Sequence, residues 1–130
     1  MTIKRIVLIL FLIISVILLA TRFLSSIDQG TTITIRNQTD QCLKDLVFVS
    51  NANKEGFNIS NIAPQTAISF QYDIGGFNEN AVNLQYISEL GDIKNYNIIG
   101  YVYEFYSHIY IDIISISPEG KLNIKVETLK

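Results

Sequence analysis

The sequence predicts an all-β protein: an antiparallel, immunoglobulin-like β-sandwich of seven or eight strands, preceded by one N-terminal transmembrane helix. An uncharged apolar run occupies residues 6–20, which is the composition of a membrane segment or a signal peptide. Beyond residue 30, apolar and polar side chains alternate as in half-buried strands, and turn residues recur about every ten residues. A small barrel is the alternative, because alternation alone does not show whether a sheet closes.

Length, composition and charge exclude several classes of protein. The 130 residues leave room for one modest domain, and the single cysteine excludes a disulfide-stapled scaffold or a cysteine-rich metal site. The 12 acidic residues are scattered singly along the chain, so we expect no metal site. No motif indicates a cofactor, and none is expected. A net charge of −2 gives no electrostatic footprint for nucleic acid.

The first 24 residues form the expected signal anchor, and the lipid bilayer is its expected partner. At about 1.5 Å per residue, residues 3–24 would extend for about 33 Å, enough to cross a hydrocarbon core of about 30 Å. Lys4 and Arg5 precede the apolar run and Arg22 follows it, so the positive-inside bias favours a cytoplasmic N-terminus, with the C-terminal domain outside the cell membrane. The residues expected to lie within the membrane include Ile6, Leu10, Ile14, Leu18 and Ala20.

Cleavage of the apolar segment is the alternative to anchoring. A secretory signal ends in two small residues spaced two apart, whereas Ala20 is preceded at that spacing by Leu18, and Ser26 by Leu24. We therefore expect an uncleaved, single-pass anchor. A linker over residues 25–30 and an extracytoplasmic domain over residues 31–130 are expected to follow it.

The strands of this domain are identified by alternation and by the turns between them. In the first strand, Ile33 and Ile35 share one face, while Thr34 and Arg36 share the other. Tracts rich in Asn, Gly, Ser or Pro separate the later strands. The expected strands comprise residues 31–36, 43–50, 57–62, 66–74, 82–86, 96–105, 107–117 and 122–127.

The alternation changes phase within the strand expected at residues 107–117. Isoleucines share one face from Ile109 to Ile113, but Ile114 and Ile116 then occupy the next register. A β-bulge between Ile113 and Ile114 would return the strand to its inward face.

Aromatic residues are dense from Tyr96 to Tyr110, and the strand expected at residues 96–105 follows a turn at residues 91–95. Tyr101, Tyr103 and Phe105 share one face of this expected strand. Aromatic side chains interspersed with polar groups are typical of recognition surfaces, and cross-strand packing in the core is the other interpretation of the same residues. The candidate binding residues are Tyr103, Tyr106, His108, Tyr110 and Asp112.

Catalysis is not expected from these residues. His108 and Asp112 share a face, but at about 3.3 Å per residue their Cα atoms lie about 13 Å apart, too far for direct hydrogen bonding by most rotamers. The sequence also lacks a G-x-S-x-G nucleophile motif. We therefore expect a protein that is not an enzyme.

Four short segments carry a resemblance to known proteins. They are Ile-x-Ile-x-Asn-Gln-Thr at residues 33–39, Ile-Ala-Pro-Gln-Thr at 62–66, Ile-Gly-Tyr at 99–101 and Pro-Glu-Gly-Lys-Leu at 118–122. Together with the anchor, they resemble small, single-pass, exported β-sandwich proteins of Gram-positive bacteria, a group with no assigned activity. The resemblance implies the architecture and the location, and it lends no functional residues.

The expected function is that of a membrane-anchored, extracytoplasmic, non-enzymatic binding or accessory module. It would recognise a protein or an envelope component through strand edges or loops. An immunity-type protein that neutralises an external toxin is the alternative. Residues 26–130 contain all 12 acidic residues and seven of the ten basic ones, a surface suited to a basic toxin. A secreted domain released by signal cleavage is a further alternative.

Overall fold

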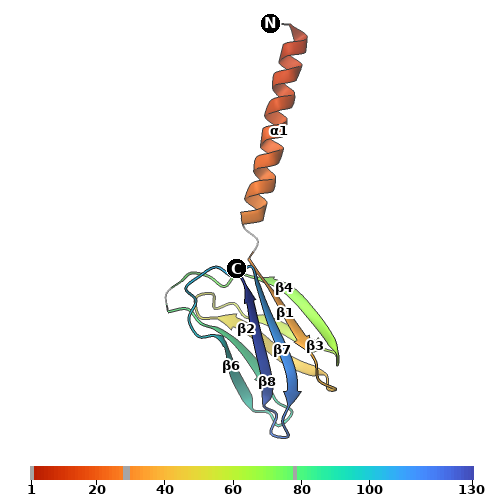
Figure 1. The fold of residues 1–130 in the computed structure, drawn as a ribbon, viewed down its shortest axis with the longest axis vertical. Helices are drawn as coiled ribbons and strands as arrows, with labels where there is room; N and C mark the ends of the chain where they lie inside the picture. Colours follow the sequence, from red (N-terminus) through yellow and green to blue (C-terminus); the bar gives the residue numbers. More distant parts are fainter. Residues whose placement is uncertain (1, 28–29, 78) are drawn as a thin grey trace.

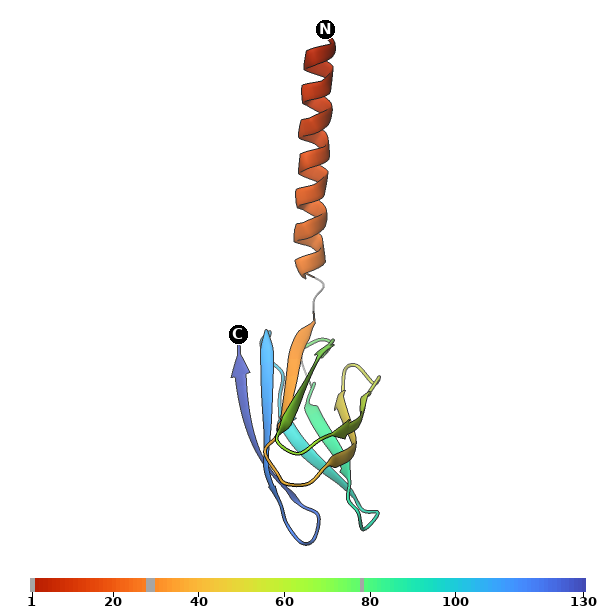
Figure 2. The same ribbon diagram turned by 90° about the vertical axis from the view of Figure 1, so that its right-hand side faces the viewer.

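A computed structural model describes residues 2–27, 30–77 and 79–130, and it shows one helix followed by a β-sandwich (Figure 1). Helix α1 (Ile3–Ile27) carries an uncharged apolar segment at residues 6–20, and no part of Ile3–Arg22 is buried inside the protein. The helix stands apart from the strands in both views (Figure 2). An apolar segment of this kind suits a membrane rather than the surface of a soluble domain.

The helix is longer than the sequence predicted. Residues 25–27, expected in the linker, continue α1, while residues 28 and 29 of that expected linker lie outside the described residues. The first strand begins at Thr31. Only three residues therefore separate the end of the helix from the sandwich.

Two four-stranded sheets form the sandwich, which confirms the predicted all-β architecture. One sheet has the order β4-β1-β7-β8, and the other has the order β3-β2-β5-β6. The strands are β1 (Thr31–Asn37), β2 (Leu43–Ser50), β3 (Phe57–Ile62), β4 (Thr66–Tyr72), β5 (Val82–Ile87), β6 (Ile93–Ile99), β7 (His108–Ile116) and β8 (Leu122–Leu129).

Strand pairing and strand order both depart from the predicted arrangement. Every pairing among these strands is antiparallel except that of β1 with β7, which is parallel. In an immunoglobulin domain the first two strands lie in the same sheet, whereas here β1 and β2 belong to opposite sheets. The chain shares the two-layer sandwich with such domains but has a different strand order, because it crosses between the sheets after β1, β3, β4 and β6.

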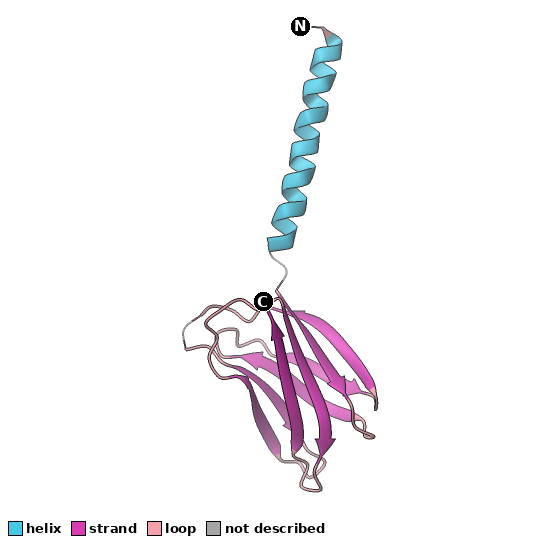
Figure 3. Cartoon of the chain, in the orientation of Figure 1, coloured by secondary structure: helices cyan, strands magenta, loops and turns pink. Residues whose placement is uncertain are grey.

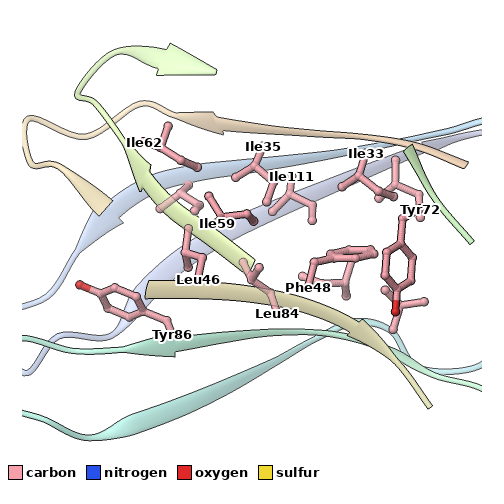
Figure 4. Close-up of a cluster of buried hydrophobic side chains, with 14 of the residues drawn as sticks. Ile33, Ile35, Leu46, Phe48, Ile59, Ile62, Tyr72, Leu84, Tyr86 and Ile111 are labelled. Atoms are coloured by element: carbon pink, nitrogen blue, oxygen red, sulfur yellow. The ribbon is translucent and has the colours of Figure 1, made fainter. Parts of the chain in front are cut away.

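The hydrophobic core lies between the sheets and is built from the inward residues that alternation identified (Figure 4). At one end of the core, the ring of Phe48 packs edge-on against Tyr72, with the centroids 5.0 Å apart. Such aromatic contacts add to the free energy of burying apolar surface. The side chains exposed to less than 2% include Ile33, Ile35, Leu43, Leu46, Phe48, Ile62, Leu84, Ile109, Ile111 and Ile113.

The predicted β-bulge in β7 is confirmed. The register of β7 with β8 shifts between Ile113 and Ser115, so that Ile114 has no partner and is 42% exposed. Beyond the bulge, Ile116 packs against the core. One extra residue therefore returns the strand to its inward face, as the change of phase required.

The strand predicted at residues 96–105 is wrong in its position. Strand β6 is Ile93–Ile99, and residues 100–107 form a loop. Lys94 and Asn95, expected in a turn, pair with Tyr86 and Gln85 of β5. The loop still alternates in burial because it crosses the end of the sandwich (Figure 3), directing alternate side chains inward. Within the loop, the Val102 N–H donates to the carbonyl of Asn80 in another loop over 2.8 Å, while Ser107, the last loop residue, bonds to Thr32 of β1 and Leu129 of β8.

Two buried asparagines hold the loops at the ends of the strands. The Nδ2 of Asn80 donates to the carbonyls of Ile74 and Gly76 over 3.0 and 2.9 Å, and its Oδ1 accepts the N–H of Ala52 over 2.9 Å. Asn37, at the end of β1, has the corresponding role at the opposite end of the sandwich. Each amide provides hydrogen bonds to backbone groups that are outside the sheet ladders.

Candidate functional site

The candidate site lies on the outer face of the sheet β4-β1-β7-β8, opposite the face that contacts the core. In the parallel pairing of β1 with β7, Thr34 is the partner of Tyr110, and Arg36 is the partner of Asp112. On both strands the intervening isoleucines point into the core. The polar side chains of neighbouring strands are thereby brought side by side. We call this set the polar cluster; its members are Thr34, Arg36, Ser69, His108, Tyr110 and Asp112.

An ion pair anchors one end of the polar cluster. The guanidinium of Arg36 donates from Nε to Oδ1 of Asp112 and from Nη2 to Oδ2 over 3.0 Å. This is the two-pronged geometry in which Arg and a carboxylate fit best. The hydrogen bond with Asp112 raises the pKa of Arg36 above its usual value. The carboxyl side chain of Asp112 is 11% exposed, and its charge is compensated at close range.

The ring of Tyr110 lies at the centre of the polar cluster. It stacks on the imidazole of His108, with the centroids 4.0 Å apart and the planes 7° from parallel. The guanidinium carbon of Arg36 lies 4.9 Å from the centroid of the same tyrosine ring, within the range of a cation–π contact. The tyrosine ring thus contacts two other planar groups, the imidazole and the guanidinium, on the outer surface of the sheet.

Hydroxyl groups hold the other end of the polar cluster. Nε2 of His108 shares a hydrogen bond of 2.7 Å with the hydroxyl of Thr34, which in turn shares one of 2.7 Å with the hydroxyl of Ser69 on β4. The carboxylate that would orient the imidazole in a catalytic triad is Asp112, and Arg36 binds it instead. The arrangement therefore presents planar and charged surface, with the polar side chains held by one another.

The structure separates the five predicted site residues. His108, Tyr110 and Asp112 come together in the polar cluster. Tyr103 is 68% exposed, on the loop of residues 100–107. Tyr106 is 5% exposed in the core, and burial raises its pKa. The side chain of Tyr106 is therefore part of the core and not of the surface. Its backbone carbonyl accepts a hydrogen bond of 2.7 Å from the Thr31 hydroxyl.

Sequence reasoning missed three members of the polar cluster: Thr34, Arg36 and Ser69. Thr34 and Arg36 were placed on the outward face of the first strand, but nothing local indicated which strand would lie beside them. The available signal was that the strands of Arg36 and Asp112 both carry polar side chains on the face opposite their isoleucines. Pairing two such faces places opposite charges within reach.

The predicted membrane residues all lie in α1. The segment Ile3–Arg22 is long and apolar enough to cross a membrane, although a signal sequence has the same properties. In the part of the chain that the structure describes, no group of three or more His, Cys, Asp or Glu side chains could hold a metal ion. The residues expected in the bilayer, all exposed, are Ile6, Leu10, Ile14, Leu18 and Ala20.

Comparison with known proteins supports the fold alone. No family model matches the chain, and no curated protein matches its sequence. The NMR structure of a protein from Eubacterium rectale is similar to this one, with a TM-score of 0.52 over 76% of this chain and 89% of that one, at 14% sequence identity. At that identity the similarity shows a shared β-sandwich and assigns no function.

Proposed function

We propose that the chain is a membrane-anchored, extracytoplasmic, non-enzymatic binding module, which recognises a protein partner through the polar cluster. The observation that carries this proposal is the layer formed by His108, Tyr110 and Arg36 on the outer face of a sheet. Tyr and Arg are the side chains most enriched at binding hot spots. Both can also make planar contacts with a second protein surface.

The hydrogen bonds within the polar cluster favour binding because they fix its side chains in advance. Arg36 is held by Asp112, and His108 is held by Thr34 and Tyr110. Side chains that are already ordered lose less conformational entropy when a partner binds. Tyr110 and His108 remain half-exposed, so their surfaces are accessible to that partner.

The proposed location rests on α1 and on the charges that flank it. Lys4 and Arg5 precede the apolar segment, and only Arg22 lies close behind it, which favours a cytoplasmic N-terminus. The sandwich would then lie outside the cell, held at the membrane by a single pass. Signal cleavage with release of the sandwich is the alternative location.

Photo-cross-linking tests the recognition surface in intact cells. Benzoylphenylalanine in place of Tyr110 keeps an aromatic ring in the polar cluster, and the same residue in place of Gln85 is the control. Gln85 is half-buried in β5 of the opposite sheet. We expect one defined protein adduct from position 110, none from position 85, and loss of that adduct when Asp112→Ala is added. Equal adducts from both positions, or none from position 110, would contradict the proposal.

An immunity-type function is the second candidate, and the charge of the sandwich favours it. All 12 acidic residues lie beyond residue 25, with seven of the ten basic ones. Such a surface attracts a basic partner and accelerates its association. The identity of the adduct from position 110 separates the two functions: an envelope protein of the same cell supports the accessory module, and a basic protein supplied from outside supports immunity.

A further inference from the structure

The loops at one end of the sandwich lie next to the point where the chain leaves for α1. β1 begins at Thr31, which pairs with Tyr72, the last residue of β4. The N–H of Thr32 donates to the carbonyl of Ser107 over 3.1 Å. The loop residues 73–77, 79–81 and 100–107 therefore lie at this end, which Figure 1 shows facing the helix.

These two loops carry exposed aromatic side chains. Val102 and Tyr106 fill the core from the loop of residues 100–107, while the aromatic residues between and beside them point outward. Exposed aromatic side chains that gather at one end of a small domain are typical of an interaction surface, whereas single ones are not. We call the following set the aromatic end: Phe77, 55% exposed; Tyr101, 51%; Tyr103, 68%; and Phe105, 60%.

The length of the connection keeps the aromatic end close to the bilayer. The apolar segment ends at Arg22, and helix α1 continues to Ile27, a further rise of about 8 Å. From Ile27 to Thr31 the chain can reach at most about 14 Å when fully extended. This end of the sandwich therefore cannot move more than about 22 Å from the hydrocarbon edge, and any bend in the connection brings it nearer.

The charge at the aromatic end is partly neutralised. Lys130, at the end of the chain, binds Glu104 of the same loop over 2.6 Å, and this carboxylate raises the pKa of Lys130. A paired carboxylate is less costly to bring against a lipid surface than a free one. Tyrosine and phenylalanine beside such pairs have the composition of side chains that lie at lipid headgroups.

We propose that the aromatic end docks onto the lipid headgroup layer of the bilayer that α1 spans, so that the sandwich lies against the membrane. The inference rests on the proposed anchoring, because α1 and the short connection to Thr31 hold the aromatic end close to the bilayer. In this orientation the strands of the sheet β4-β1-β7-β8 run away from the membrane. The polar cluster is then held at a fixed height above the lipid surface.

The sequence contains no tryptophan, so single-tryptophan variants of the full chain test this docking directly. Tyr103→Trp reports on the aromatic end, and Leu90→Trp is the matched control. Leu90 is 70% exposed and lies beyond the opposite end of β5, a strand of six residues that spans about 20 Å. Phe11→Trp, within α1, reports on anchoring. Each variant is reconstituted into phosphatidylcholine vesicles, either plain or brominated near the headgroup end of one acyl chain.

We expect brominated lipid to quench Tyr103→Trp and Phe11→Trp and to leave Leu90→Trp unchanged. The Tyr103→Trp emission should also shift to shorter wavelength when detergent is replaced by vesicles. Quenching of Phe11→Trp without quenching of Tyr103→Trp or of a second reporter, Phe105→Trp, would overturn the docking and leave the anchoring intact. An unquenched Phe11→Trp would overturn both. Equal quenching at positions 90 and 103 would overturn a docking specific to the aromatic end.

Discussion

The side-chain amide of Asn37 joins three segments of the chain inside the protein. Its Nδ2 donates to the carbonyls of Gln41, Ile62 and Ala63 over 2.8, 3.0 and 3.2 Å. Its Oδ1 accepts the Thr39 N–H over 3.0 Å. The residue is 1% exposed, so water cannot replace these bonds without entering the structure.

The substitution Asn37→Ala should therefore lower the free energy of unfolding by about 2–4 kcal/mol, because several buried backbone groups lose their partners at once. Denaturant unfolding of the full chain in detergent micelles measures this. Asn97→Ala is the matched control; Asn97 is exposed, and its Nδ2 donates to the side chain of Asn83 and to no buried backbone carbonyl among the described residues. The control should stay within about 0.5 kcal/mol of the wild type. Equal losses in the two variants would refute this role for Asn37.

Single residues also show where sequence reasoning about the site was limited. His108, Tyr110 and Asp112 were identifiable because they alternate on one face of a strand. The partners Arg36 and Thr34 were not, since Arg36 lies 76 residues from Asp112 and Thr34 lies 74 from His108. A contact between residues that far apart depends on which strands become neighbours, which local pattern does not encode.

The bulge in β7 leads to a prediction about how the strand tolerates the deletion of one residue. Deleting Ile114 removes the residue that has no partner in β8 and leaves the pairs on both sides of it in phase. We expect the shortened chain to fold, with a change in unfolding free energy of about 1 kcal/mol or less. Deleting Lys125 from β8 instead turns every following side chain of that strand to the opposite face. That control should fail to give a cooperative unfolding transition.

Thermal unfolding followed by circular dichroism distinguishes the two deletions. If loss of Ile114 prevents folding as completely as loss of Lys125, the bulge is needed for strand curvature rather than only for restoring the phase. The bulge itself was predictable, because a row of isoleucines that changes phase within one strand keeps facing the core only if one extra residue is inserted there.

The loop of residues 100–107 shows why one element was misplaced. Alternation records which side chains are buried, and Val102 and Tyr106 enter the core while Tyr103 and Phe105 face solvent. A strand also needs a neighbour for its backbone groups. The sequence shows the alternating burial but not the neighbouring strand. An extended loop over the end of the core therefore has the same sequence pattern as a strand.

For the molecule as a whole, the anchor makes the clearest prediction. Lysines at the centre of a membrane helix cost about 2.5–3.5 kcal/mol each, so the double substitution Leu10→Lys and Ile14→Lys should release the protein from membranes washed with alkaline carbonate. Leu10→Ala with Ile14→Ala keeps the helix apolar and should remain in the membrane pellet. If the wild-type chain is found in the medium without α1, the segment is a cleaved signal and anchoring is wrong.

Orientation is tested on the same cells with the Leu90→Cys variant in a Cys42→Ser background. A membrane-impermeant maleimide should label this exposed position on sealed cells if the sandwich lies outside. Labelling that appears only after the membrane is opened would place the sandwich in the cytoplasm and contradict the positive-inside assignment.

The apolar helix, most of the strands and their inward faces could be predicted from the sequence alone. Each of these features depends on composition or on alternation with a period of two, and both can be recognised within a few consecutive residues. Which strands are neighbours, and in particular the parallel pairing of β1 with β7, became known only from the folded structure. That pairing brings Arg36 to Asp112 and Thr34 to His108. Which strands become neighbours depends on the packing of the whole core, because the contacts that stabilise one arrangement over another join residues far apart in the sequence.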